Sequence, residues 1–415
     1  MIRIAFLCFI FAFSIGCNQS KAQQDQRVKT GIEVLAENNF ELLKGKRVGL
    51  ITNATGVNSA LVSTIDLIDQ AEGVELGALY GPEHGVRGEY AAGDKVKTYL
   101  DERTGVTVFS LYGATRKPTD EMLEGIDVLV YDIQDIGSRS YTYISTMGLA
   151  MDAAAEKGIE FIVLDRPNPL GGNKVEGNIV EEGYVSFVSQ FPVPYIYGLT
   201  PGEVAKMINE EGWLDSGKKV DLKVVPLEGW SRSMTFDQTG LPWVPTSPHI
   251  PHEYSAYFYV ATGVMGELGV FSEGVGYTLP FQVYAAEWID EAELANEMNK
   301  LNLPGVIFRP TVFKPFYAKH QGKELHGVQI HFSDFDQAEL LKLQFYFMQV
   351  HHQLYPEVDV FEQAENRWSM FDKVNGTDQI RLKFSENYLV SDIEEYLDKD
   401  VQSFREKSQA YYLYN

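Results

Sequence analysis

Short apolar runs alternate with amphipathic segments over the first half of the chain. Six of the apolar runs are of strand length, at Arg47–Thr52, Val74–Tyr80, Val106–Leu111, Val128–Asp132, Phe161–Asp165 and Leu222–Pro226. Apolar residues at helical spacing lie between them, at Ser59–Gln70, Tyr141–Lys157 and Thr200–Gly212. Strands that alternate with helices predict an α/β fold with a mostly parallel sheet and helices on both faces.

The pattern changes after about Gly229. Residues 240–252 are rich in proline, so they predict a long ordered crossing or an active-site wall and exclude a helix. Beyond them, helices are expected at Asp290–Leu301 and Leu340–Tyr355, and strands at Val306–Pro310 and Leu325–Phe332. We therefore expect a second, smaller α+β domain in the C-terminal half.

The N-terminus has the pattern of a targeting segment. Arg3 is followed by the apolar run Ile4–Ile15, which suits a signal peptide and is short for a membrane span. The run ends in Gly16-Cys17, which resembles a bacterial lipobox, so residues 1–17 are predicted to be a lipoprotein signal peptide with Cys17 as the lipid anchor. The polar residues 18–27 suit a flexible tether. An ordinary secretory signal with an incidental cysteine is the alternative.

Composition excludes several classes of function. A net charge of −23 makes nucleic acid a poor partner, because phosphate backbones are bound by basic surfaces. The second cysteine, Cys8, lies inside the signal, so the mature chain has no disulfide and no cysteine-ligated zinc. The turn Thr52–Gly56 lacks a dinucleotide-binding glycine pattern, and the histidines lack metal-ligand spacing. We therefore expect no cofactor and no metal.

Polar side chains follow the predicted strands at their carboxyl ends. Asn53 follows the first strand, and the run Gly81-Pro82-Glu83-His84-Gly85 follows the second. Asp135 and Arg139 come after the fourth strand, and residues 165–169 end the fifth. Ligands of open α/β sheets bind outside the carboxyl ends of the strands, so we expect these side chains to share one site.

Carboxylates dominate this expected site. Glu83, Asp135 and Asp165 are the candidate catalytic groups, because paired carboxyl groups that flank a bond are the machinery of glycoside hydrolysis. Glu83 can alternatively be a loop-stabilising residue that pairs with Arg87. Arg139 can bind a substrate carboxylate through both of its terminal nitrogens, or can form an internal salt bridge with Asp135.

Several motifs in this order resemble the exo-β-N-acetylmuramidase (NamZ-like) family. They are Gly81–Gly85, Tyr131–Tyr143, Leu164–Pro169, Ser272–Gly274 and Phe371–Asp378, and the resemblance covers nearly everything after residue 28. The run Ser272–Phe281 departs from the family pattern, because two arginines of that pattern are replaced here.

The resemblance implies a Rossmann-like catalytic domain at 28–235 and a smaller C-terminal domain at 236–415 that completes a cleft. It implies release of N-acetylmuramic acid from non-reducing ends of peptidoglycan fragments, with Glu83 as the catalytic carboxylate. Muramoyl saccharides are then the expected partners, and the membrane is reached only through the anchor. An exported protein is expected, either periplasmic or an outer-membrane lipoprotein of a Gram-negative-type bacterium. The substrate-binding residues that we expect are Asn53, His84, Arg87, Arg139, Tyr141, Asn168 and Glu273.

Our hypothesis gives Glu83 the task of protonating the glycosidic oxygen. Asp135 or Asp165 would activate water, or the 2-acetamido oxygen of the sugar would act as the nucleophile. Arg139 or Arg87 would bind the carboxylate of the lactyl group. Two other functions stay open: a carbohydrate-binding lipoprotein without catalysis, and a cell-wall amidase or deacetylase on the same scaffold.

Overall fold

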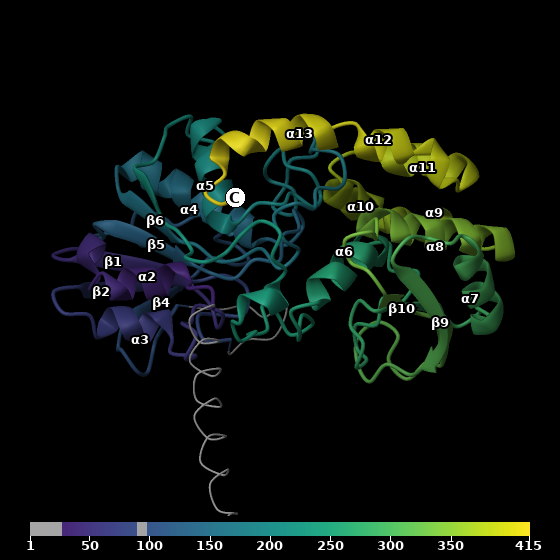
Figure 1. Cartoon of the computed structure of the whole chain (residues 1–415), viewed down its shortest axis with the longest axis horizontal. Coiled ribbons are helices and arrows are strands. Elements are labelled where there is room, and N and C mark those ends of the chain that lie inside the picture. Colours follow the sequence, from purple (N-terminus) through teal and green to yellow (C-terminus); the bar gives the residue numbers. More distant parts are fainter. Residues whose placement is uncertain (1–26, 89–97) are drawn as a thin grey trace, which may run out of the picture.

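The computed structural model describes residues 27–88 and 98–415. The predicted signal peptide, Cys17 and all of the predicted tether except Arg27 lie outside the described residues. Two domains lie side by side, with the α/β domain on the left and the smaller domain on the right of Figure 1. Among the described residues, no helix is long and apolar enough to cross a membrane.

The larger domain is built on a seven-stranded sheet with the order β3-β4-β2-β1-β5-β6-β7. Its strands are β1 (Arg47–Thr52), β2 (Glu75–Gly81), β3 (Tyr99–Leu100), β4 (Thr107–Ser110), β5 (Val128–Asp132), β6 (Glu160–Leu164) and β7 (Leu222–Val225). All neighbours pair in parallel except β3, which is antiparallel to β4 at the edge. The six predicted strands are confirmed. The two-residue strand β3 is too short for a pattern to indicate.

Helices cover both faces of this sheet, as predicted. On one face, α2 (Gly31–Glu37) and α3 (Thr64–Asp69) pack on one set of alternating strand residues. On the other face lie α4 (Tyr143–Lys157) and α5 (Pro201–Glu210). The start expected for α3 at Ser59 is wrong, because Ser63 caps that helix through the backbone N–H of Ile65.

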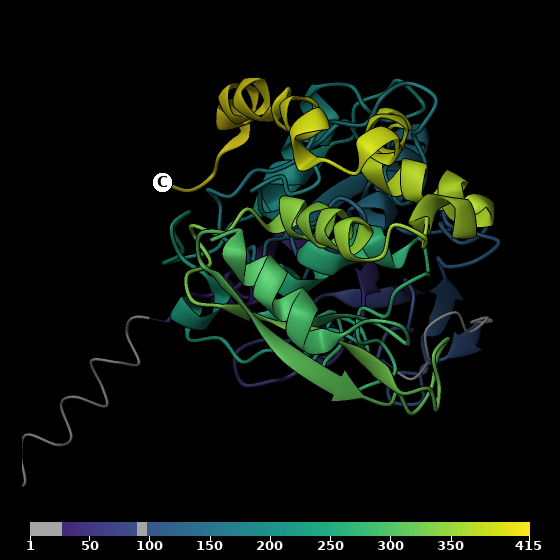
Figure 2. The same ribbon diagram turned by 90° about the vertical axis from the view of Figure 1, so that its right-hand side faces the viewer.

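The smaller domain contains an antiparallel sheet with the order β8-β10-β9. Its strands are β8 (Val283–Ala286), β9 (Val306–Phe313) and β10 (Leu325–Phe332). Three longer helices pack with it into one core, and Figure 2 shows this domain from its outer side. They are α6 (Ser255–Gly266), α7 (Glu291–Lys300) and α8 (Leu340–Leu354). The pattern did not indicate α6, because a helix buried nearly all round carries no polar stripe.

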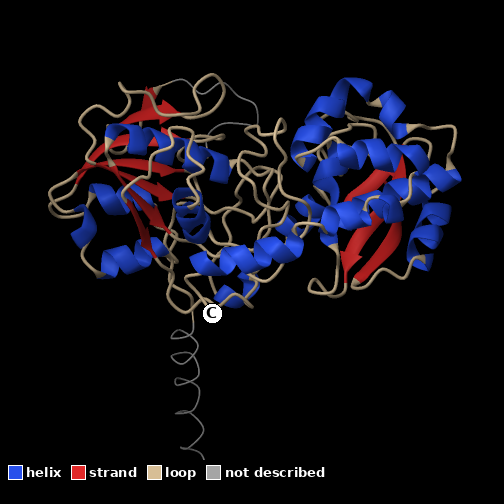
Figure 3. Cartoon of the chain, turned by 90° about the horizontal axis from the view of Figure 1, so that it is seen from above, coloured by secondary structure: helices blue, strands red, loops and turns tan. Residues whose placement is uncertain are grey.

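Short helices then carry the chain back to the larger domain. They are α9 (Val360–Gln363), α10 (Trp368–Asn375), α11 (Gln379–Asn387), α12 (Glu394–Asp398) and α13 (Val401–Ser408). Phe404 of α13 is buried in the core of the larger domain. The last residues of the chain therefore pack on the first domain, although the sequence placed them in the second. Figure 3 shows the two sheets in separate domains, with loops between them.

Candidate active site

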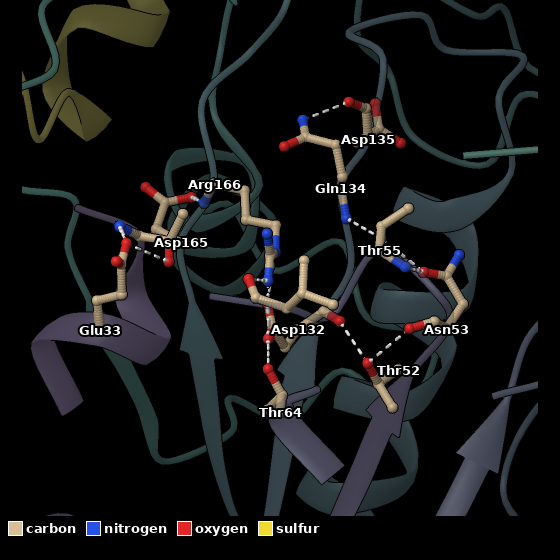
Figure 4. A network of polar contacts seen from close by, with 12 residues as sticks. Glu33, Thr52, Asn53, Thr55, Thr64, Asp132, Gln134, Asp135, Asp165 and Arg166 are labelled. Atoms are coloured by element: carbon tan, nitrogen blue, oxygen red, sulfur yellow. Dashed lines mark hydrogen bonds and ion pairs between the residues drawn. The ribbon is translucent and has the colours of Figure 1, made fainter. Parts of the chain in front are cut away.

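A buried network joins the loops at the carboxyl ends of the strands (Figure 4). Arg166 donates to both carboxylate oxygens of Asp132, over 2.5 and 3.0 Å, and Thr64 donates to the same carboxylate over 2.5 Å. The backbone N–H of Gln134 donates to Thr55, whose own hydroxyl donates to the side chain of Asn53. The ion pair is buried and has several further hydrogen bonds, so it fixes the loops that surround the site.

Glu83 lies at the end of β2, in a tight turn. The next two residues, His84 and Gly85, have φ values of 76° and 79°, so the backbone turns sharply after Glu83. His84 is not a glycine, and its left-handed conformation is the kind of strain found at functional sites. Burial, with the hydrogen bond that its hydroxyl donates to Glu83, raises the pKa of Tyr112 to about 12.

Glu83 faces a cavity of about 190 Å³. The lining residues come from the end of β2, the start of α4 and the proline-rich segment, and α6 adds one more. They are Glu83, His84, Ser140, Tyr141, Thr142, Tyr143, Ser247, Pro248, His249 and Tyr259. Both domains therefore supply the cavity wall, and Glu83 is its carboxylate among the described residues.

Three tyrosines form the inner wall of this cavity. The rings of Tyr141 and Tyr143 meet edge to face at 5.0 Å, and Tyr259 lies 5.5 Å from Tyr141. Thr246 holds two of them, since Tyr141 shares a 2.7 Å hydrogen bond with its hydroxyl and Tyr143 donates to its carbonyl. Burial raises the pKa of all three tyrosines, so their hydroxyl groups stay protonated.

Two histidines flank Glu83. His84 is buried beside it, and His249 reaches the cavity from the proline-rich segment. Burial, together with the charge of His84, lowers the pKa of His249. His249 and Tyr259 were not identified as site residues from the sequence. The proline-rich character of residues 240–252 was the available signal for His249, whereas nothing local indicated Tyr259.

Asp135 is buried and does not line the cavity. Its Oδ1 accepts hydrogen bonds from the hydroxyl of Tyr197, at 2.6 Å, and the backbone N–H of Gly137, at 2.7 Å. Its Oδ2 is buried with no hydrogen-bond partner in the described part of the chain. Burial raises the pKa of Asp135 to about 6. Its charge in turn helps to raise the pKa of Tyr141, so the two groups are electrostatically coupled.

Asp165 points away from the cavity toward the start of α5. Its carboxylate accepts from the hydroxyl of Thr200 over 2.7 Å and from the backbone N–H of Gly202 over 2.8 Å. The hydroxyl of Tyr414, near the end of the chain, donates to the same carboxylate over 2.5 Å. Burial raises the pKa of Asp165 to about 7. This geometry gives Asp165 a structural task at a helix N-terminus.

Neither of the two arginines expected to bind a carboxylate lines the cavity. Arg139 is buried and donates to the backbone carbonyls of Asn178, Val193 and Val374 and to Ser189. Burial lowers the pKa of Arg139 to about 10. The salt bridge with Asp135 considered as its alternative does not form. Arg87 forms ion pairs with Asp101 and Asp66, at 2.6 and 2.9 Å.

Both predicted asparagines are held by the loops around the cavity. Asn53 accepts from the backbone N–H and the hydroxyl of Thr55, and a hydrogen bond also joins its side chain to Tyr143. Asn168 donates to the carbonyl of Leu199 and accepts from the N–H of Leu170. Through these contacts the two asparagines fix the loops that surround the cavity.

Glu273 belongs to a different cavity, of about 260 Å³, in the smaller domain. Lys319, His320 and Arg367 also line this cavity. Burial, together with the charge of Glu267, raises the pKa of Glu273 to about 7. The structure therefore does not bring Glu273 to the cavity that Glu83 faces. Among the described residues, no group of three or more His, Cys, Asp or Glu side chains could hold a metal ion.

Comparison with known proteins identifies the family of this chain. Family models for the N-terminal and C-terminal domains of the exo-β-N-acetylmuramidase NamZ match residues 48–254 and 257–414. The chain belongs to the NamZ family. The peptidoglycan β-N-acetylmuramidase NamZ of Bacillus subtilis (strain 168) is 45% identical over 397 residues, which cover 96% of this chain and 94% of that protein.

Two crystal structures of DUF1343 family proteins from Bacteroides fragilis NCTC 9343 have the same fold. One is 58% identical with a TM-score of 0.91, over 94% of this chain and all of that one. The other is 29% identical with a TM-score of 0.75, over 94% of this chain and 99% of that one. The two NamZ domain models meet between residues 254 and 257, later than the predicted boundary at 235/236. The proline-rich wall of the cavity therefore falls in the N-terminal NamZ domain.

Proposed function

We propose that this chain is an exo-acting glycosidase that removes N-acetylmuramic acid from the non-reducing ends of peptidoglycan fragments. The observation that carries the proposal is the placement of Glu83. Its carboxylate lies at the carboxyl end of β2, in a small cavity walled by tyrosines and histidines from both domains. A cavity of about 190 Å³ suits a single terminal sugar, which fits exo-action. The 45% identity to a peptidoglycan β-N-acetylmuramidase supports the same substrate class.

The arrangement favours a mechanism with one protein carboxylate. Neither Asp135 nor Asp165 lines the cavity, and Glu83 is the carboxylate among its described lining residues. Glu83 would protonate the glycosidic oxygen while the 2-acetamido oxygen of the sugar attacks C1, which forms an oxazolinium ion that keeps its N–H and releases the rest of the glycan. The carboxylate of Glu83 would then take a proton from water as that water attacks C1 and opens the oxazolinium ring. N-acetylmuramic acid with retained configuration is the product, and Glu83 ends protonated as it began.

The carboxylate of the lactyl group needs a cation, and Arg116 is the best-placed arginine. The positive charge of Arg116 opposes the rise in the pKa of Tyr112, whose hydroxyl donates a hydrogen bond to Glu83. The guanidinium of Arg116 lies 4.2 Å from the centre of the Phe187 ring. Arg116 is exposed at this edge of the sheet, whereas Arg87 and Arg139 are engaged inside the protein. We propose that Arg116 selects muramic acid over glucosamine at the terminal sugar.

The test compares Glu83→Gln with Glu75→Gln, which changes an exposed carboxylate at the other end of the same strand. With a chromogenic β-N-acetylmuramide, Glu83→Gln is expected to lower kcat by about a thousandfold, while Glu75→Gln leaves it unchanged. Proton NMR of the first product should show the β-anomer. Inversion would contradict the acetamido route, and turnover unaffected by Glu83→Gln would remove Glu83 from the mechanism. Failure to cleave any muramoyl glycoside would favour a binding protein, and release of peptide or acetate would favour an amidase or deacetylase.

Arg116→Gln tests the selectivity. We expect a loss of at least tenfold in kcat/KM for β-N-acetylmuramides and little change for the matching β-N-acetylglucosaminides. Arg103→Gln is the control, since Arg103 is an exposed arginine paired with Asp66. An equal loss on both sugars would contradict the assignment.

We also propose that the chain is exported and tethered to a membrane through Cys17. The lipobox-like Gly16-Cys17 supports this proposal. Wild-type protein is expected in the detergent phase of a phase separation, and Cys17→Ser in the aqueous phase. Wild-type protein in the aqueous phase would favour an ordinary secretory signal.

A further inference from the structure

The segment that follows β9 carries two exposed aromatic side chains to the rim of the active-site cavity. Phe316 is 65% exposed and Tyr317 is 49% exposed. The hydroxyl of Tyr317 is 2.9 Å from Nε2 of His249, and the two rings are nearly parallel with centres 5.9 Å apart. Since His249 lines the cavity of Glu83, Tyr317 extends the wall of that cavity outward.

The smaller domain holds this aromatic rim in place. The backbone N–H of Phe316 donates to the carbonyl of Gly276 over 2.6 Å. Gly276 has a φ of +96°, and a Cβ there would lie 2.2 Å from the carbonyl oxygen of Tyr317. Tyr277 stacks on the buried Phe313 at 4.7 Å and contacts Phe316 at 5.8 Å. Tyr317 is therefore exposed and yet fixed. Less side-chain conformational entropy is then lost when a ligand binds to it.

We propose that Tyr317, supported by His249, forms the binding subsite for the sugar ring on the leaving side of the scissile bond. The proposal rests on the function proposed above and names the part of the substrate that this rim binds. An exo-acting enzyme encloses the terminal sugar and must hold the next ring at the mouth of its cavity. The apolar face of a pyranose packs on an aromatic ring. The hydroxyl group at the edge of the tyrosine ring stays solvated while the ring face is covered by the sugar. The ligand class is thus a pyranose such as N-acetylglucosamine, linked through O4 to the muramic acid.

Two substrates distinguish the contribution of this subsite from that of the residues around Glu83. The disaccharide N-acetylmuramoyl-β-1,4-N-acetylglucosamine fills the leaving-side subsite, whereas N-acetylmuramoyl β-fluoride leaves it empty because fluoride is the leaving group. In the full mature chain, Tyr317→Ala is expected to lower kcat/KM for the disaccharide by about tenfold, with a much smaller effect on the fluoride. Tyr317→Phe keeps the ring and is expected to retain most of the activity on the disaccharide.

Ile307→Ala is the matched control. Ile307 is an apolar residue of β9 in the same domain, is 55% exposed, and is not among the lining residues of the cavity. We expect it to behave as the wild type on both substrates. Equal losses on disaccharide and fluoride in Tyr317→Ala would overturn the inference, because Tyr317 would then act through His249 on the enclosed sugar. An unchanged disaccharide rate in Tyr317→Ala would overturn it too. If the wild type cleaves neither substrate, the proposed function itself is wrong. This result is distinct from the two outcomes above, in which the wild type is active.

Discussion

The guanidinium of Arg139, in the α/β domain, donates a hydrogen bond to the carbonyl oxygen of Val374, in the smaller domain, over 3.0 Å. The same side chain donates to the carbonyls of Asn178 and Val193, each over 2.7 Å. Four of its five N–H groups are used in this way, with Ser189 as the fourth acceptor. Arg139 is therefore a buried connection between the two domains.

Removing this connection should destabilise the protein. Arg139→Met leaves three buried carbonyls without their donor, so we expect the free energy of unfolding to fall by about 3 kcal/mol or more. Arg139→Lys should recover only part of this loss, because one ammonium group cannot reach all three carbonyls. Urea unfolding measures both variants against Arg309→Met, an exposed arginine of β9. A stable Arg139→Met with a raised KM for muramoyl substrates would restore the substrate-binding role that the sequence indicated.

Buried Asp165 should make stability depend on pH in the acid range. Its pKa is about 7 in the folded protein, against an ordinary value near 3.8. Between about pH 4 and pH 7 the native state holds a proton that the unfolded state has lost. The free energy of unfolding therefore falls as pH rises through this window, by up to about 1.4 kcal/mol per pH unit for one such group, and stays level above it.

Asp165→Asn tests this linkage, because an amide can accept from Gly202 and donate toward the hydroxyls of Thr200 and Tyr414. We expect its free energy of unfolding to fall less between pH 5 and pH 7.5 than that of the wild type. Asp135 and Glu273 also have raised pKa values, near 6 and 7, but they are present in both proteins and cancel in the comparison. Parallel pH profiles from urea unfolding would contradict the assignment.

Gly276 should control the position of the aromatic rim. Gly276→Ala places a Cβ against the carbonyl of Tyr317, so Phe316 and Tyr317 must shift. We expect the ratio of disaccharide to fluoride hydrolysis to fall severalfold. Gly322→Ala, in the β9–β10 segment that carries Tyr317, also replaces a glycine of positive φ, at +75°, but its Cβ meets nothing within 4 Å. A fall in the ratio for Gly322→Ala as large as that for Gly276→Ala would show that loop strain, and not the Tyr317 contact, is responsible.

Tyr414 should contribute to the stability of the larger domain from the far end of the chain. Its hydroxyl donates to Asp165 and accepts from the backbone N–H of Leu227. Tyr414→Phe removes both hydrogen bonds, and we expect a loss of about 1–3 kcal/mol in the free energy of unfolding. Tyr346→Phe, on a half-buried position of α8, is the control in thermal or urea unfolding. Equal stability of the two variants would contradict this role.

Local signals in the sequence were sufficient for most of the larger domain. The alternation of apolar runs located its six parallel strands, most clearly the central strands β1, β5 and β6, which are buried on both faces and read as continuous apolar segments. The run Thr200–Glu203 forms a capped helix start that a local pattern can indicate, since the two hydrogen bonds of its capping box lie within four residues. The buried helix α6 gave no such signal.

The side-chain directions at the site could not be read from the sequence. The pattern correctly placed Glu83, Asp135 and Asp165 after the carboxyl ends of β2, β5 and β6, but a strand end does not say which way the next side chain points. Asp165 turns toward α5 and Tyr414, which lies 249 residues further along the chain. Arg139 meets acceptors 39, 54 and 235 residues away. Such partners are set by the packing of the two domains, and no local spacing encodes them.

The end of the chain returns to the domain in which the chain began. Leu413 donates to Glu203, Tyr414 to Asp165, and the carbonyl of Asn415 accepts from the N–H of Arg232. Residues 413–415 are synthesised after all the strands of the α/β domain, so that domain lacks these three hydrogen bonds until they have left the ribosome. Its packing is therefore completed only after that point, and a purification tag fused directly to Asn415 would lie beside the contact with Arg232.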